Sequence, residues 1–223
     1  MGRREGASAR SRPVDFPSRA IEARVARAVF GPRAEDPAGS PVRARGYREA
    51  TLLCADVVNL PGLAASTGAE VLVAVLDELF LVFDRAAERH GMARVPVRGQ
   101  ACAAVAGVPD PRLDHARAAA DLALELAGAA HGIAPPGGTP VALRIGLHTG
   151  PLVATLASGG AVRELWGETA RVAGLMASEG LPGMVQVSGA TAARLFPGYW
   201  LSSRRSGGAS SEEAWILTGR RPV

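Results

Sequence analysis

Two long stretches of the chain carry apolar side chains at helical spacing, and each needs an apolar surface to pack against. In residues 68–91 the apolar positions are Leu72, Leu76, Leu79, Phe80, Phe83 and Ala87. In residues 110–132 they are Leu113, Ala116, Ala120, Leu124 and Ala127. This spacing predicts two amphipathic helices, because residues three and four apart share one helical face. Two such helices favour a layered fold in which they cover a sheet.

Segments of strand character lie before, between and after these helices. The run "TLLCADVV", residues 51–58, is continuously apolar and ends at "NLPG", which is typical of a strand buried in the centre of a sheet. Residues 94–111, "RVPVRGQACAAVAGVPDP", predict two short strands around a turn at 98–99. In "VALRIGLHTG", residues 141–150, apolar residues alternate with a second set that includes Arg144 and His148. We therefore expect these two side chains to point the same way.

The order of these elements is β-α-β-β-α-β, followed by a mixed extension. The extension contains the segments "PLVATLA", "VRELWGETARVAGLMASEG", "MVQVSGATAARLF", "GYWLSS" and "EEAWILT". They predict further strands and two more helices. We expect an α+β fold with a ferredoxin-like βαββαβ core, its helices on one face of the sheet, over residues 47–223.

Residues 1–46 differ in composition from the rest of the chain. They hold ten arginines against five acidic residues, whereas the remainder holds 15 basic and 16 acidic residues. We expect a basic, mostly disordered tail with one short helix in "SRAIEARVARAVF". Because the folded part is close to neutral, the sequence gives no strong nucleic-acid signal.

Several signals bear on where the protein works. No apolar run approaches the roughly 20 residues that span a bilayer, and the N-terminus lacks the apolar stretch of a signal peptide. Cys54 and Cys102 match no metal spacing, which favours free thiols in a reducing compartment. The chain has no lysine and a single asparagine, which favours a GC-rich coding genome. We expect a cytoplasmic, bacterial protein.

Five ordered segments resemble the catalytic domain of class III adenylate and guanylate cyclases, between about residues 49 and 196. They are "LLCADVVNLPGLA", "LDELFLVFDRAAERHG", "VRGQACAAVAGVPDPRLDHARAA", "RIGLHTGPLVA", and "LWGETARVAGLM" followed by "PGMVQVSGAT". The resemblance implies a dimer whose active sites lie between the subunits. It also implies two divalent ions, Mg²⁺ or Mn²⁺, on two carboxylates, so that the ribose 3' hydroxyl attacks the α-phosphate.

Some positions match the roles that the resemblance implies. Asp56 matches the first metal carboxylate, and Val57 matches the residue whose carbonyl helps to hold the ion. Asn59 and Leu60 lie in the loop that cradles phosphates, so we include them among the candidate ligand-binding residues. Arg144 matches the arginine that contacts phosphate. Glu164 falls at the acidic residue that reads the purine.

Other positions depart from the family pattern. Gln100 replaces the second metal carboxylate, and Pro96 replaces the lysine that reads the purine. Arg171 and Leu175 stand at the asparagine and arginine that stabilise the transition state in the family. Pro61, in the phosphate loop, has no N–H to offer. Since the chain has no lysine and its one asparagine is in the phosphate loop, these groups are not replaced from elsewhere in the chain.

Two of the candidate sites keep alternative interpretations open. Asp56 is either a surviving metal or ligand contact or a structural acid that caps the next turn. Glu168 and Arg171 either form a new polar site at a dimer interface or are a solvated pair. Arg144 is expected to bind something anionic, since an unpaired buried arginine is costly. His148 is interpreted as a hydrogen-bonded sheet histidine.

These positions lead to one leading hypothesis and two alternatives. The leading hypothesis is a homodimer that has lost cyclisation and binds a nucleotide or another anionic small molecule at its cleft, with Mg²⁺ or Mn²⁺ only if a nucleotide is bound. The second is an enzyme refitted to another substrate, with a polar set of Asp56, Gln100, Glu164, Glu168 and Arg171. The third is a heterodimer in which a related chain supplies the missing groups.

Overall fold

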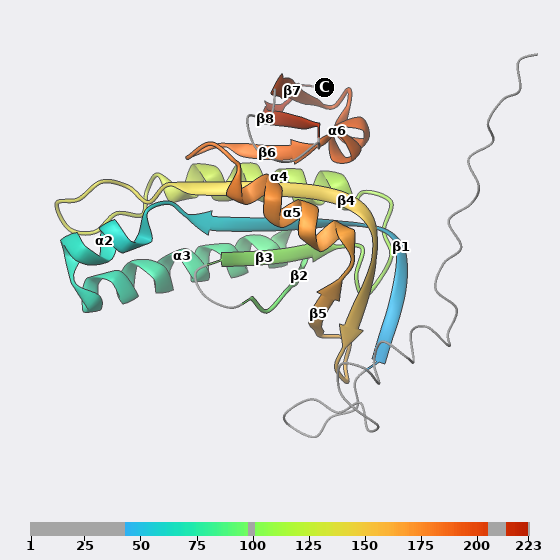
Figure 1. Ribbon diagram of the computed structural model, residues 1–223, viewed down its shortest axis with the longest axis horizontal. Helices are drawn as coiled ribbons and strands as arrows, with labels where there is room; N and C mark the ends of the chain where they lie inside the picture. The colour runs from blue at the N-terminus through green and yellow to red at the C-terminus, as the bar shows by residue number, and fades with distance from the viewer. Residues whose placement is uncertain (1–42, 98–100, 205–212, 223) are drawn as a thin grey trace, which may run out of the picture.

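The computed structural model describes residues 43–97, 101–204 and 213–222. These segments form one eight-stranded sheet with the order β2-β3-β1-β4-β6-β8-β7, and β5 pairs with β4 (Figure 1). The strands are β1 Arg43–Val57, β2 Ala93–Arg94, β3 Ala101–Ala106, β4 Leu143–Leu156, β5 Val162–Trp166, β6 Val185–Ser188, β7 Tyr199–Arg204 and β8 Ala214–Arg220. The helices are α2 Leu60–Thr67, α3 Ala69–Arg89, α4 His115–Ala130, α5 Glu168–Ser178 and α6 Gly189–Leu195.

The two central strands are longer than the apolar runs that predict them. β1 begins at Arg43 rather than Thr51, and β4 continues to Leu156, through most of "PLVATLA", which was expected as a separate strand. Along β4 the predicted alternation is confirmed, because Leu143, Ile145 and Leu147 are all buried. β1 pairs antiparallel with both β3 and β4, so the centre of the sheet has the connectivity of the predicted core.

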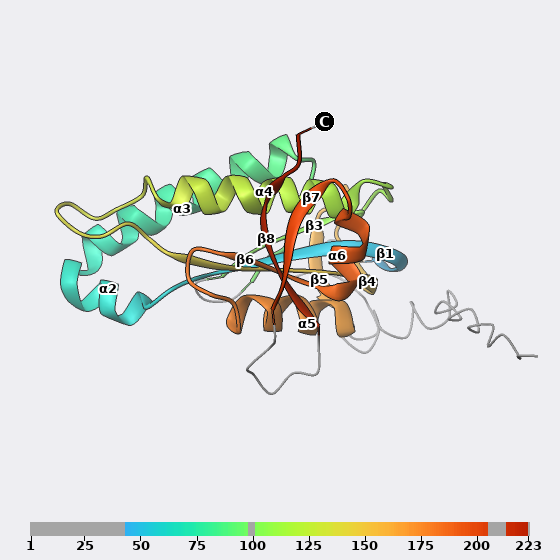
Figure 2. The ribbon, with the colours of Figure 1, turned by 90° about the horizontal axis from the view of Figure 1, so that it is seen from above.

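Helices cover both faces of the sheet. α3 and α4 pack side by side on one face, whereas α5 lies on the other (Figure 2). The expectation of helices on one face therefore holds for the core, and the extension adds α5 on the opposite side. α5 approaches β4 very closely at Gly146, where a Cβ atom would come within 2.1 Å of the backbone nitrogen of Ala177. Only glycine permits this approach.

The α4 helix buries a different set of residues from the predicted face. Leu113, predicted on the buried face, is fully exposed because the helix begins two residues later, at His115. Small residues make up much of the buried face: Ala116, Ala118, Ala119, Ala120, Ala123 and Ala130. They let α4 lie close to the sheet beside Phe83 of α3, in a closed apolar core.

Several expectations concern residues outside the described ranges. The tail helix expected at 18–30, the turn of the hairpin and Gln100 all lie there. Both cysteines are free, as expected. Within the described ranges, no helix combines the length and apolar character that crossing a membrane requires.

Candidate functional site

Asp56 and Arg144 lie opposite each other at the ends of the two central strands. Their Cα atoms are register partners across β1 and β4. Both alternate onto the face that α5 covers, since Cys54 and Gly146 on the same strands pack toward that helix. The structure therefore places the two residues that the sequence singled out opposite each other on one face of the sheet.

Arg144 is only partly satisfied by its surroundings. Its Nη1 donates to the carbonyl oxygen of Ser178, 3.0 Å away, at the last residue of α5. Its Nε is buried and has no hydrogen-bond partner within the described residues. An unpaired buried N–H is costly. The surrounding protein encloses this N–H, so a ligand can reach it only if neighbouring side chains move.

The described residues do not provide the donor set of a two-metal centre. The resemblance places divalent ions between Asp56 and position 100, and Gln100 offers a neutral amide there. Among the residues with described positions, no three His, Cys, Asp or Glu side chains are grouped to hold a metal ion. Magnesium and manganese prefer carboxylate-rich oxygen sites. A single carboxylate opposite the cation of Arg144 fits neither ion well.

The loop after β1 carries the remaining candidates from the first segment. Asn59 adopts a left-handed backbone conformation with φ 52° and immediately precedes α2. Its side chain lies over Gly62, where a Cβ atom would come within 2.3 Å of Asn59 Nδ2. The Val57 and Leu60 side chains are buried in the core. These two residues can therefore meet a ligand only through backbone atoms.

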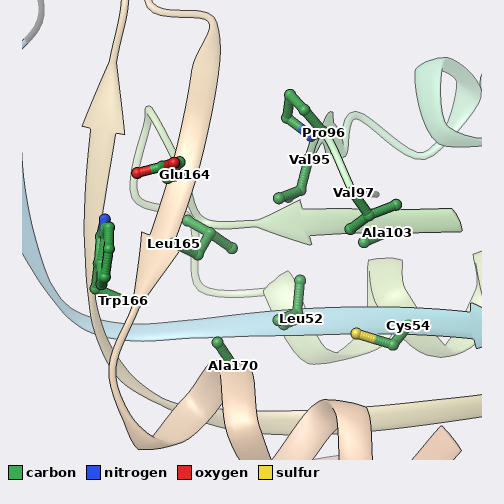
Figure 3. Close-up of a pocket in the computed structure, with 10 residues that line it drawn as sticks. All are labelled: Leu52, Cys54, Val95, Pro96, Val97, Ala103, Glu164, Leu165, Trp166 and Ala170. Atoms are coloured by element: carbon green, nitrogen blue, oxygen red, sulfur yellow. The ribbon is translucent and has the colours of Figure 1, made fainter. Parts of the chain in front are cut away.

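A pocket of about 320 Å³ lies on the α5 side of the sheet (Figure 3). Its walls come from β1, β3, β5, α5 and the segment before the hairpin turn: Leu52, Cys54, Val95, Pro96, Val97, Ala103, Glu164, Leu165, Trp166 and Ala170. Pro96 and Glu164, the two positions that the resemblance assigns to purine reading, line this pocket together. Glu164 is the one carboxylate in an otherwise largely apolar wall.

The Cys54 thiol contributes no charge to this pocket. Burial, with a further contribution from the nearby Asp56 carboxylate, raises its pKa from 9.0 to about 12. The thiol is therefore protonated at neutral pH and is a poor nucleophile.

Glu168 and Arg171 do not join the pocket. Arg171 Nε donates to Glu168 Oε2 over 2.8 Å, and both side chains are more than half exposed. The hydrogen bond from Arg171 lowers the pKa of the Glu168 carboxyl. Within this subunit they are an exposed pair one turn apart on α5. The structure thus separates them from the pocket that holds Glu164.

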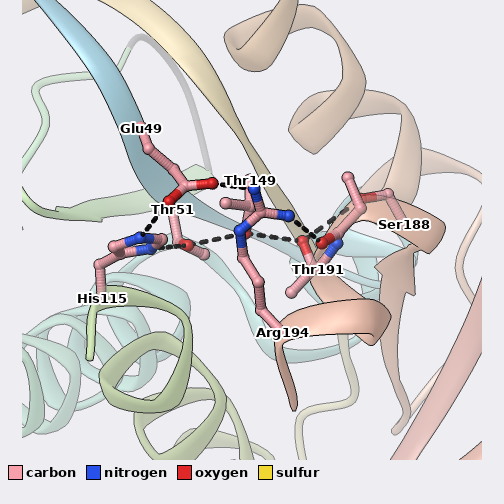
Figure 4. A network of polar contacts seen from close by, with 8 residues as sticks. Glu49, Thr51, His115, Thr149, Ser188, Thr191 and Arg194 are labelled. Carbon is pink, nitrogen blue, oxygen red and sulfur yellow. Dashed lines mark hydrogen bonds and ion pairs between the residues drawn. The ribbon is translucent and has the colours of Figure 1, made fainter. Parts of the chain in front are cut away.

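Sequence reasoning missed a polar cluster that begins on the other side of the sheet, in which the hydroxyl residues and His115 are buried and the Glu49–Arg194 pair is partly exposed (Figure 4). Its members are Glu49, Thr51, His115, Thr149, Ser188, Thr191 and Arg194. A usable signal was present, because Thr51 and Thr149 occupy core-facing positions of otherwise apolar strands. His148 hydrogen-bonds to Ser188, which agrees with its interpretation as a hydrogen-bonded sheet histidine.

The sequence matches one family of known catalytic domains. Residues 42–211 match the profile of the adenylate and guanylate cyclase catalytic domain. An adenylate cyclase of Mycobacterium tuberculosis is 36% identical over 208 residues, which cover 92% of this chain and 47% of that protein. The chain therefore spans about half the length of these curated relatives.

Solved structures agree with the sequence matches. The guanylate cyclase domain of RhGC from Catenaria anguillulae, in complex with GTP, superimposes with a TM-score of 0.71 at 25% identity, covering 79% of this chain and 100% of that one. A non-canonical dimeric guanylyl cyclase domain of RhoGC from Blastocladiella emersonii gives a TM-score of 0.73 at 25% identity, covering 79% and 99%.

Proposed function

The chain belongs to the adenylate and guanylate cyclase catalytic domain family, and within that family we propose a module that binds a nucleotide or another anionic small molecule without cyclising it. The observation that carries this proposal is the pocket between Pro96 and Glu164. It keeps a concave site at the purine position, but its wall has lost the cationic residue that the family uses there. A binding site thus persists beside an incomplete catalytic one.

The loss of cyclisation follows from the number of groups that are changed. Cyclisation needs a deprotonated 3' hydroxyl and neutralised phosphates, which the family obtains from metal ions and positioned donors. Removing one such donor typically costs about 10²–10³ in rate. Here position 100 is an amide, position 96 is a proline and position 175 is a leucine. The combined loss leaves little catalysis to measure.

Retained binding is supported by the groups on the α5 face. Arg144 lies opposite Asp56 at the end of the central strands, on the face that α5 covers. The pocket volume of about 320 Å³ falls at the lower end of the range for small-molecule sites, roughly 300–1,000 Å³. Arg144 would hold an anionic group, while the pocket beside Glu164 would hold an apolar ring with a hydrogen-bond donor.

A second copy of the chain is part of the proposal. Val97 and Trp166 line the pocket and remain substantially exposed in the single subunit. Apolar side chains of this size at a pocket rim are typical of a surface that another subunit covers. A homodimer would close the pocket and bring the partner's α5 toward it. A heterodimer with a related chain would use the same surface.

The competing function is a variant cyclase. It is favoured by the 36% identity to a protein named as an adenylate cyclase. Under this alternative, Gln100 and Arg171 would support catalysis, alone or with groups from a related partner chain.

One experiment separates these functions. The purified chain of 223 residues is incubated with ATP or GTP and excess Mn²⁺, beside an Asp56→Ala variant, and cyclic nucleotide is quantified. We expect no product from either protein, together with saturable nucleotide binding by calorimetry. Product that disappears in Asp56→Ala would establish the variant cyclase instead. If neither product formation nor nucleotide binding is observed, the proposed binding function for nucleotides is overturned.

A further inference from the structure

A continuous chain of buried hydroxyl groups connects two histidines. We call it the hydroxyl chain, and its members in order are Ser188, Thr191, Thr149 and Thr51. Consecutive oxygens are 3.2, 3.0 and 2.7 Å apart. At one end His148 Nδ1 lies 2.7 Å from the oxygen of Ser188, and at the other end His115 Nδ1 lies 2.8 Å from that of Thr51. Figure 4 shows the part from Ser188 to His115.

The two histidines lie on opposite sides of the sheet. His148 is on the α5 side, because a Cβ atom at Gly150 would lie 3.3 Å from His148 Nε2 and 2.7 Å from Thr169 Oγ1 of α5. His115 is the first residue of α4, which covers the other face. The hydroxyl chain therefore links the two helical layers.

The number of hydrogen atoms couples the two imidazole rings. Five contacts join the rings through the four hydroxyls, and each hydroxyl donates one hydrogen. The fifth hydrogen must come from one of the two Nδ1 atoms. The four hydroxyl residues are fully or almost fully buried, so water does not compete for these bonds. When one Nδ1 donates, the other must accept.

Glu49 decides the direction of the hydroxyl chain. Its Oε2 lies 3.3 Å from His115 Nε2, and Arg194 pairs with its other oxygen. A carboxylate accepts only, so His115 Nε2 has to donate. Burial is the main cause that lowers the pKa of His115 and so keeps the ring neutral. The Asp114 carboxylate raises this pKa, whereas the Arg112 cation lowers it further. Neutral His115 therefore accepts at Nδ1.

We propose that the hydroxyl chain is a directional hydrogen-bond relay, in which the Glu49 carboxylate keeps a proton on Nδ1 of His148. Nε2 of His148 lies toward the first turn of α5, where the Glu168 carboxylate, paired with Arg171, is close enough to be affected by His148. Glu49 and His115 also line two surface pockets of about 360 Å³ each. A change in the charge or contacts of the Glu49 carboxylate on the α4 side thus changes which nitrogen of His148 carries the proton on the α5 side. The coupling is reciprocal.

Nitrogen NMR of histidine side chains tests the relay in the full chain labelled with ¹⁵N-histidine. Spectra are recorded at about pH 8, above the ordinary imidazole pKa of about 6.5. His148→Gln assigns the signals of the ring. We expect Nδ1 of His148 to be protonated in the unsubstituted chain, since the relay requires it. An unprotonated Nδ1 would overturn the proposal.

Two substitutions interrupt the relay at different points. Thr149→Val removes a central hydroxyl, and Glu49→Ala removes the acceptor that sets the direction; in both we expect a His148 form with unprotonated Nδ1 to become populated. Thr155→Val is the matched control, because Thr155 is equally buried on β4 but bonds only toward Glu164. The signals of His90 and His131 report that each variant is folded. Unchanged His148 nitrogens in folded Thr149→Val and Glu49→Ala would contradict the relay.

Discussion

The two faces of the sheet are built on different principles. On the α4 side, alanines and larger apolar residues close a continuous core, and Thr51, Thr149 and Thr191 are hydrogen-bonded to one another beside it. On the α5 side, the same strands leave a pocket and a half-buried Asp56, and the buried Nε of Arg144 has no hydrogen-bond partner among the described residues. A closed apolar core stabilises the fold, whereas a pocket can receive a ligand.

This contrast explains how the family's fold persists here beside altered catalytic positions. Among the substitutions that separate this chain from the cyclase pattern, those at positions 96, 171 and 175 belong to the α5 side or its rim. Pro61 lies in α2, and position 100 is outside the described residues. Positions 96, 171 and 175 lie outside the closed apolar core. A fold does not by itself fix the chemistry of the site that is built on it.

The largest expected effect tests the closed face. Phe83→Ala leaves a cavity beneath α3, where the ring is fully buried, and should lower the free energy of unfolding by about 3–5 kcal/mol. Leu165→Ala, at the partly exposed pocket wall on the other face, should cost less than about 2 kcal/mol. Urea denaturation measures both variants. Equal losses would show that the two faces contribute alike to stability.

A substitution at the contact between β4 and α5 tests how tightly the helix is held. Gly146→Ala places a methyl group against the α5 backbone, and we expect destabilisation of about 3 kcal/mol as α5 is displaced. Gly174→Ala, within α5 itself, meets no atom within 4 Å and should stabilise by about 0.5–1 kcal/mol. Thermal unfolding measures whether each variant is less or more stable than the unsubstituted chain. A tolerated Gly146→Ala would mean that α5 moves freely on the sheet.

A smaller effect is expected at the unsatisfied arginine. Arg144→Ala should weaken nucleotide binding at least about tenfold, because a hydrogen bond from a charged donor contributes about 1.5–3 kcal/mol. Stability should change by less than about 1 kcal/mol, since Arg144 is not part of the core. Calorimetric titration with ATP and GTP measures affinity. Arg85→Ala, exposed on α3, is the control and should bind like the unsubstituted chain.

The smallest effect concerns the pH dependence of the closed face. Burial lowers the folded pKa of His115 below its unfolded value, so the unfolded chain takes up a proton first as the pH falls below about 6.5. The free energy of unfolding should therefore fall as the pH is lowered through this window. Above the window, His115 should make no pH-dependent contribution. Chemical denaturation from about pH 8 to pH 5 measures the slope. In His115→Gln the free energy of unfolding should fall less steeply as the pH is lowered. An identical slope would assign the loss of stability to other groups.

Local sequence patterns determined most of the elements and the family. The apolar spacing correctly predicted α3, and the alternation of Leu143, Ile145 and Leu147 predicted the buried face of β4. The order of the cyclase-like segments identified the family before any contact was known. The changes at positions 96 and 100 could also be identified from the sequence alone, because each replaces a single residue of the family's motif.

Tertiary contacts decided the rest. The start of β1 at Arg43 has no apolar signal, since the strand is held there by pairing with the far end of β4. The exposure of Leu113 depends on where α4 begins. The relay joins residues up to 98 positions apart in sequence, such as Thr51 and Thr149. Sequence periodicity reports which face a residue occupies, but only the order of strands in the sheet determines which distant side chains share that face.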